Sequence, residues 1–307
     1  MNAAFVSRPG ILEVHMHRGP AAAADAPPDL LLEVPHGATA AAHFDELHGR
    51  FAAPPDVRLR EFFFVNTDVG SPELAHAVAA EFVAAHPTRT AAVVRCLIPR
   101  TFLDCNRRID AATAPAASAP GAPTPGLPPW IVDERDRRML LAMYEQYREV
   151  VEAGFAMACG GGGLGLMVHT YAPRSIDVAV DDDIVGALRA EYAPDKLSRW
   201  PLRSPVDFIT HDPEGRDLSA AAVVAAAERE FVAAGYATVR NGAYNLHPVT
   251  LANLVAERHP GATVCLEVRR DLLMAEFVPF VELAVDPVRV AAAAAPLARA
   301  VGVRFSK

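Results

Sequence analysis

Apolar positions along the chain fall into two kinds of segment. Short apolar runs predict strands, and longer segments with apolar residues three or four positions apart predict amphipathic helices. The expected strands are 11–17, 30–34, 91–98, 164–168, 236–240 and 262–268. The expected helices are 71–85, 133–156, 182–191, 220–234, 249–258 and 288–301. Because strands alternate with helices, the pattern predicts an α/β fold with three layers, α/β/α.

One segment, 111–129, interrupts this alternation. It consists almost entirely of Ala, Pro, Gly, Ser and Thr, which bury too little apolar surface to offset the entropy that ordering costs. We therefore expect a flexible insertion there. The remaining length suits one large α/β domain, so a single domain over residues 1–307 is expected.

Composition and charge exclude several classes of partner. The net charge is -8, and basic residues do not cluster with aromatic ones, which argues against nucleic acid. The sequence has no uninterrupted run of about 18 apolar residues, so we expect no membrane span. Residues 1–20 lack the basic, then apolar, then small-residue order of a secretory signal. The 4 cysteines form no C-x-x-C pair, and Cys96 and Cys265 lie in apolar strand-like contexts. Reduced thiols of this kind favour a cytoplasmic location.

Three apolar runs end on a histidine or an acid. The run 31–34 is followed by His36 and the run 164–168 by His169, while 62–65, interpreted as another strand, is followed by Asp68. Ligand sites gather at the carboxyl ends of strands in open α/β sheets. Two histidines and a carboxylate with one open position are a ligand set for catalytic zinc. The alternative is that these are strand-end histidines satisfied by hydrogen bonds.

A polar cluster follows the expected strand 91–98. It contains Arg100, Asn106 and Arg107, and guanidinium groups beside a buried strand need anionic partners. Such groups could grip a substrate carboxylate or polarise a carbonyl. They could equally pair with helix acids at a solvated strand exit.

Glu267 is an acid inside the otherwise apolar strand 262–268. Burial of an unpaired carboxyl raises its pKa toward the range that a general base needs. The alternative is a salt bridge to Arg269 or Arg270 at the end of the strand.

Five short motifs occur in order along residues 31–271. They are Pro35-His36-Gly37, Asn66-Thr67-Asp68, Pro99-Arg100 with Asp104-Cys105-Asn106-Arg107, Val168-His169-Thr170-Tyr171, and Leu266-Glu267-Val268. Together they resemble the motifs of the N-formylglutamate amidohydrolase family, which is similar in fold to zinc carboxypeptidases and deacylases. The resemblance implies a mixed, mostly parallel central sheet and a single catalytic domain.

The resemblance also implies roles for individual residues. The implied metal ligands, which would bind one zinc ion, are His36, Asp68 and His169. Glu267 would be the general base that accepts a proton from the attacking water, and Arg100 would polarise the scissile carbonyl. Asn106 and Arg107 would receive a substrate carboxylate. Glu73, in the first turn of the expected helix 71–85, is the alternative carboxylate ligand.

The chain departs from the family near the expected pocket. Val69 replaces the family's tryptophan, and residues 241–248 replace its glycine-glycine-tyrosine loop. In the replacement loop Tyr244 and His247 are candidate substrate-binding residues. Packing of Tyr244 and capping of a helix by His247 are the alternatives.

Arg174 is a further candidate substrate-binding residue. It lies five positions after His169 and could line the same cleft. An ion pair with Asp177 or with the acidic run 181–183 is equally compatible with the sequence.

These features lead to one expected function with two alternatives. We expect a zinc-dependent amidohydrolase that cleaves the amide of a small carboxylate-bearing acyl-amino acid similar to N-formylglutamate, without nucleic-acid or membrane partners. One alternative is a non-catalytic protein that binds a carboxylate ligand in the same cleft. The other is a peptidase or peptide-tailoring hydrolase with the same zinc site.

Overall fold

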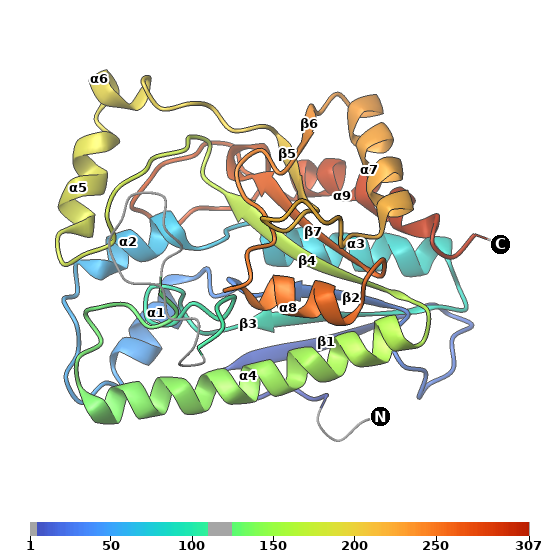
Figure 1. Ribbon diagram of the computed structural model, residues 1–307, viewed down its shortest axis with the longest axis horizontal. Coiled ribbons are helices and arrows are strands. Elements are labelled where there is room, and N and C mark those ends of the chain that lie inside the picture. The colour runs from blue at the N-terminus through green and yellow to red at the C-terminus, as the bar shows by residue number, and fades with distance from the viewer. Residues whose placement is uncertain (1–4, 110–124, 307) are drawn as a thin grey trace.

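A mixed 7-stranded sheet forms the centre of the molecule (Figure 1). The computed structural model describes residues 5–109 and 125–306, so most of the expected insertion at 111–129 lies outside the described residues. The strand order is β1-β3-β2-β4-β7-β5-β6. The strands are β1 (Leu12–Arg18), β2 (Leu30–Val34), β3 (Thr90–Cys96), β4 (Leu164–Tyr171), β5 (Val206–Ile209), β6 (Thr238–Arg240) and β7 (Thr263–Arg269).

The four central strands are parallel. β2 pairs in parallel with β3 and β4, and β4 pairs in parallel with β7. β1 is antiparallel to β3, and β5 is antiparallel to β7. Every residue of β2 and β4 is buried, which is why these strands are mostly apolar, with Glu33 in β2 and His169 and Thr170 in β4 as polar exceptions. The carboxyl ends of β2, β4 and β7 therefore meet at one edge of the sheet.

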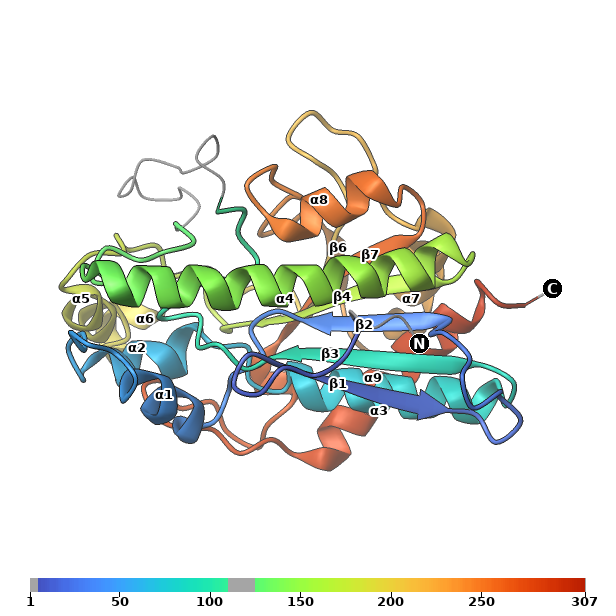
Figure 2. The same ribbon diagram turned by 90° about the horizontal axis from the view of Figure 1, so that it is seen from below.

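Helices cover both faces of the sheet (Figure 2). On one face lie α3 (Ser71–Ala85), α7 (Ala221–Ala233) and α9 (Pro287–Gly302), and on the other lie α4 (Glu134–Gly160) and α8 (Leu251–Arg258). Successive side chains of a strand point to opposite faces. Leu30 and Leu32 therefore pack in the hydrophobic cluster between the sheet and α3, while Leu31 packs in the cluster between the sheet and α4. The predicted three-layer α/β/α fold is confirmed.

Shorter helices surround one end of the sheet. They are α1 (Ala41–His48), α2 (Leu59–Asn66), α5 (Ile184–Glu191), α6 (Pro194–Leu197) and the 3-10 turn η1 (Arg270–Leu272). Through the described part of the chain, every helix is too short or too polar to cross a bilayer.

The prediction of a strand at 62–65 is wrong, because these residues belong to α2. All of them are buried, so the run carries no period that would separate a strand from a buried helix turn. Asp68 therefore lies in the turn between α2 and α3, and not at the end of a strand as predicted.

Candidate metal centre

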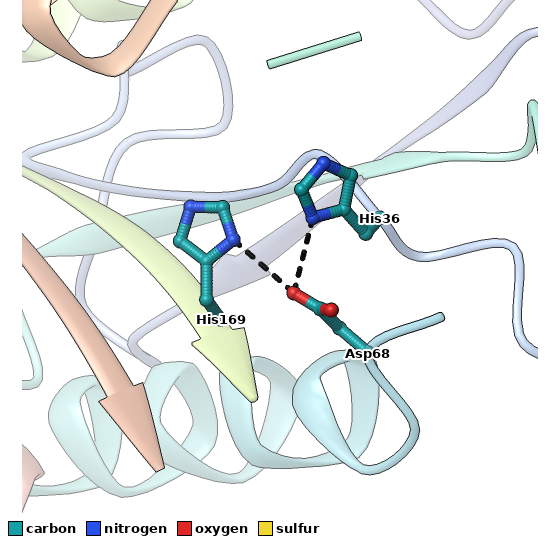
Figure 3. A group of neighbouring side chains, drawn as sticks. All are labelled: His36, Asp68 and His169. Carbon is teal, nitrogen blue, oxygen red and sulfur yellow. Dashed lines mark hydrogen bonds and ion pairs between the residues drawn. The ribbon is translucent and has the colours of Figure 1, made fainter. Parts of the chain in front are cut away.

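Three elements bring His36, Asp68 and His169 together at the edge where the parallel strands end (Figure 3). His36 follows β2 by two residues, and Asp68 lies in the turn between α2 and α3. His169 lies within β4, because that strand continues beyond the predicted end at 168 to Tyr171. All three side chains are buried.

Close backbone packing fixes the loop that carries His36. A Cβ atom on Gly37 would lie 2.7 Å from Arg95 Cγ and 3.0 Å from the carbonyl oxygen of Cys96, so this position has no room for a larger residue. Arg95 Nε donates a hydrogen bond to the Gly37 carbonyl at 2.8 Å. The loop after β2 is thus held against β3, which fixes the backbone position of His36.

Local hydrogen bonds shape the turn that carries Asp68. Thr67 Oγ1 donates to the carbonyl of Ala38, which joins this turn to the loop after β2. Ser71 Oγ donates to the Asp68 carbonyl at 2.7 Å. Gly70 has a φ of 89°, the left-handed conformation that glycine adopts without strain. Asp68 is therefore held on both sides before its carboxylate makes any contact.

The two imidazoles converge on one carboxylate oxygen. Asp68 Oδ2 lies 3.2 Å from His36 Nδ1 and 3.1 Å from His169 Nδ1. One potential ligand atom from each residue lies within 4.8 Å of the other two. His169 Nε2 is buried without a hydrogen-bond partner among the described residues. Two nitrogens and a carboxylate oxygen gathered in a buried space fit a divalent metal ion.

The neighbouring histidines favour the ionised form of Asp68. Burial alone would raise the pKa of Asp68, but His36 and His169 outweigh burial and hold that pKa well below its usual value. Asp68 therefore remains a carboxylate, the form that binds a cation.

Arg270 holds the other oxygen of Asp68. This buried arginine lies 3.4 Å from Asp68 Oδ1 through one terminal nitrogen, which also donates to the Thr170 carbonyl at 3.1 Å. Its other terminal nitrogen donates to the Val65 carbonyl. Oδ1 is occupied by Arg270 while Oδ2 faces the histidines. This contact of Arg270 with Asp68 was not predicted, although an arginine directly after an apolar strand is a visible signal in the sequence.

Asp104 orients His36 from the opposite side. His36 Nε2 lies 2.9 Å from Asp104 Oδ1, so Nδ1 is the nitrogen that remains available toward Asp68. Asp104 Oδ2 lies 3.0 Å from Arg100 Nε and 3.6 Å from a terminal nitrogen of Arg107. Burial opposes ionisation, but the two arginines hold the pKa of Asp104 well below its usual value. Asp104 stands in one of the family motifs, but the sequence alone did not reveal its contact with His36.

Replacing Asp104 by asparagine is expected to weaken metal binding about 10- to 100-fold, because carboxylate partners that orient a ligating histidine contribute on this scale. Titration of the protein against a competing chelator measures the change. Asp45→Asn is the matched control, since Asp45 forms an exposed ion pair with Arg60. Equal affinity in Asp104→Asn and wild type would contradict the assignment.

Glu267 lies beside His169 across the sheet. The two residues are partners in the β4–β7 register. Glu267 Oε2 is buried without a hydrogen-bond partner among the described residues, and burial raises the pKa of Glu267 to about 7. Arg269 pairs with Asp271 at 2.8 Å and Arg270 turns to Asp68. Among residues 5–109 and 125–306, no salt bridge neutralises Glu267 at the strand end.

Comparison with known proteins identifies the family. Residues 29–274 match the family model of N-formylglutamate amidohydrolase. The chain belongs to this family. The solved gene product Atu2144 from Agrobacterium tumefaciens is 19% identical, with a TM-score of 0.56 over 98% of each chain. The N-formylglutamate amidohydrolase from Ralstonia eutropha JMP134 is 16% identical, with a TM-score of 0.55 over 96% of this chain and 99% of that one.

These two structural likenesses show a shared fold, and no curated protein matches the sequence. Membership of the N-formylglutamate amidohydrolase family supports an amidohydrolase activity. The family match spans all three residues of the candidate metal centre as well as Glu267.

In this member of the amidohydrolase family, Asp104 joins the polar residues of the 100–107 cluster. Arg100 and Arg107 both approach its carboxylate, and the backbone nitrogen of Asn106 donates to it at 3.0 Å. Asn106 Oδ1 accepts a hydrogen bond from the backbone of Ala252 at 3.0 Å, which leaves its amide group as a donor. Through Asp104, the 100–107 cluster is therefore connected to His36, whose imidazole Asp104 orients.

The remaining predicted substrate-binding residues have other contacts. Arg174 donates to the Trp200 carbonyl at 2.6 Å, and among the described residues it makes no hydrogen bond or ion pair with the metal centre. His247 Nδ1 accepts from the backbone of Val249 at 3.3 Å, as expected of a residue next to a helix start. Tyr244 is 47% exposed. Tyr244 is near enough to Arg100 and Arg107 to interact electrostatically with both, whereas Arg174 and His247 make their hydrogen bonds elsewhere.

Arg203 is a residue that sequence analysis missed. Its guanidinium lies 5.0 Å from the ring centre of Tyr171 and 5.7 Å from that of Tyr244, and it donates to the Tyr244 hydroxyl at 3.1 Å. Its positive charge also opposes the raised pKa of Glu267. Arg203 follows no apolar strand, so the sequence carries no signal that separates it from a surface arginine.

Proposed function

We propose that this protein is a zinc-dependent amidohydrolase that cleaves the amide of a small carboxylate-bearing acyl-amino acid similar to N-formylglutamate. The observation that carries the proposal is the buried group of His36, Asp68 and His169 beside the unpaired carboxyl of Glu267. Family membership supports the amide as the bond that is cleaved.

The ligand set suits zinc. Two imidazoles and one carboxylate with a fourth open position are a common arrangement in catalytic zinc sites. When bound, zinc would act as a Lewis acid and make water a nucleophile near neutral pH. His36 would use Nδ1, since Nε2 is directed at Asp104, and Arg270 would keep the Asp68 carboxylate oriented.

Glu267 would move the proton. Its carboxylate would accept a proton from the attacking water and return it to the leaving nitrogen. Its Oε2 has no competing hydrogen bond among the described residues, so this oxygen is available for the transfer. Register pairing with His169 fixes Glu267 on the strand next to the metal ligand.

Arg100, Asn106 and Arg107 would bind and orient the substrate. Arg100 Nε donates a hydrogen bond to Asp104, and its terminal nitrogens make no hydrogen bond to the residues described. These donors would stabilise the negative charge that develops on the amide oxygen. The amide group of Asn106 and the guanidinium of Arg107 would receive the substrate carboxylate.

We also propose a cytoplasmic location and a small-molecule or peptide-like substrate, with no nucleic-acid or membrane partner. All 4 cysteines are free and buried, as suits a reducing compartment. A net charge of -8 disfavours polyanionic partners.

Hydrolysis of a substrate panel tests the function. The zinc-loaded protein is assayed with N-formyl and N-acyl forms of acidic and neutral amino acids and with short peptides. We expect turnover of a small acyl-amino acid, and loss of both zinc and turnover in His169→Ala. His259→Ala, a change in a partly exposed histidine at the end of α8, is the control. Binding of these ligands without turnover would favour the binding-protein alternative, and cleavage confined to peptides would favour a peptidase.

The pH dependence of kcat/KM is expected to show an acid limb that belongs to Glu267. Burial raises the pKa of Glu267 from 4.5 to about 7 in the metal-free protein, and a nearby dication favours the carboxylate and lowers that pKa. A general base works when deprotonated, so kcat/KM falls as the pH drops through a value between 4.5 and about 7. A profile that stays flat down to pH 4.5 would contradict this role.

A further inference from the structure

A second group of histidines lies away from the candidate metal centre, between β1 and α3. His15 and His17 are on β1, an edge strand of the sheet, and His76 is on α3. Val14 and Met16 pack on the α4 side of the sheet, so the alternating residues His15 and His17 point to the α3 side. The three rings meet there, since the ring centre of His76 lies 5.2 Å from that of His15 and 5.3 Å from that of His17.

Two of these histidines already have nearly the spacing of ligands on one ion. His17 Nε2 and His76 Nδ1 are 3.0 Å apart. In a tetrahedral site with zinc–nitrogen bonds of about 2.0–2.1 Å, two ligand nitrogens are separated by about 3.3 Å. These two nitrogens are hydrogen-bonded to each other, so the rings must turn for both lone pairs to converge on one ion, while the separation itself opens by only a few tenths of an ångström.

His15 supplies a third nitrogen after a side-chain rotation. Within the described residues, the group His36, Asp68 and His169 is the one with three ligand atoms already within 4.8 Å of each other, so His15 is not yet in place. Its side chain is 51% exposed and its Nε2 lies 3.5 Å from Glu13 Oε2. A half-exposed ring edge-on to His76 can turn at little cost, because no core packing holds it.

The electrostatic surroundings leave the nitrogens available. Burial, followed by the neighbouring histidines, lowers the pKa of His76 to about 4 and also lowers the pKa of His17. The lowered pKa values favour the neutral rings that bind metal, and the proton of the His17–His76 hydrogen bond would move to the other nitrogen of its ring when an ion binds. Arg95 is the nearby cation, and it lies 3.9 Å from the Glu13 carboxylate, which offsets its charge.

We propose that His15, His17 and His76 form a second metal site, which binds a late first-row transition-metal dication such as Zn2+ and joins the edge strand β1 to α3. Imidazole nitrogens favour these ions over magnesium and calcium. The site uses residues of two elements that the proposed amidohydrolase chemistry does not involve, so it stands or falls independently of that function.

Metal counting on the full-length protein tests the proposal. The protein is stripped of metal and dialysed against increasing Zn2+, and bound zinc per chain is measured by mass spectrometry. We expect wild type to bind one equivalent more than His17→Gln or His76→Gln, and these variants to keep hydrolytic turnover. His36→Ala should lose the other equivalent and keep this one. His259→Gln, with an ordinary partly exposed histidine, is the matched control and should bind as wild type does.

A spectroscopic measurement separates the histidine site from adventitious binding. Cu2+ added to protein whose catalytic site is filled with zinc should give an electron paramagnetic resonance spectrum with nitrogen couplings, and His76→Gln should lose them. Added Zn2+ should also raise the Tm of wild type more than that of His76→Gln, because an ion bound to the folded state stabilises it. Equal zinc content in wild type, His17→Gln and His76→Gln would overturn the proposal, as would nitrogen couplings that persist in His76→Gln.

Discussion

Replacing Glu267 by glutamine is expected to lower kcat by about 10²- to 10⁴-fold, the range that a general base contributes. Glutamine keeps the size of the side chain but cannot accept the proton. Since Glu267 Oε2 has no hydrogen-bond partner among the described residues, the substitution breaks no structural contact of that atom. Steady-state kinetics on the best substrate of the panel, with zinc content measured in parallel, would show the loss.

The result is informative only if the variant keeps its metal and its ligand. We expect Glu267→Gln to bind zinc and substrate as wild type does, which separates a lost proton transfer from a lost site. Glu276→Gln makes the same chemical change at an exposed position and should leave kcat unchanged. Turnover of Glu267→Gln within a few-fold of wild type would rule out Glu267 as the base.

Replacing Asp68 by asparagine is expected to abolish tight metal binding and to lower the free energy of unfolding by about 3–5 kcal/mol, the cost of leaving a buried ionic partner uncompensated. Arg270 would lose the carboxylate at Oδ1, and the two histidines would lose their shared anionic partner. Zinc content and urea unfolding of the metal-free protein measure the two effects separately.

Glu73→Gln is the control that decides between the two carboxylates the sequence offered. Glu73 lies in the first turn of α3 and is exposed, and it is absent from the group of potential ligands. We expect this variant to keep both its zinc and its stability. Loss of zinc in Glu73→Gln with retention in Asp68→Asn would reverse the assignment of the ligand.

The pattern of apolar residues predicted the elements with a clear period or a clear boundary. The helix 71–85 begins and ends where α3 does, and β2 has the predicted bounds 30–34. The pattern failed where a short apolar run has no period. Residues 62–65 form part of α2, and the four residues of β5 (Val206–Ile209) were not predicted at all. Both segments derive their structure from what they pack against.

For the site as well, the sequence pattern indicated some of the residues but few of their contacts. The histidines after 31–34 and 164–168 were visible because a polar residue ends an apolar run. The apolar pattern alone did not show that they meet, and only the family resemblance implied it, because the meeting depends on β2 and β4 being neighbours in the sheet although more than a hundred residues separate them in the chain. The contacts of Asp104 and Arg270 depend on loop geometry, which a sequence pattern does not describe.

The strand order β2-β4-β7 also couples metal affinity to folding. His36, His169 and Glu267 come from distant parts of the chain, so no local fragment contains the site, and the site exists only once the long-range sheet pairings have formed. Such pairings close large loops and form slowly. An ion that binds at His36, Asp68 and His169 would then connect segments that the sheet pairings have brought together, and its binding free energy would add to the stability of the folded state.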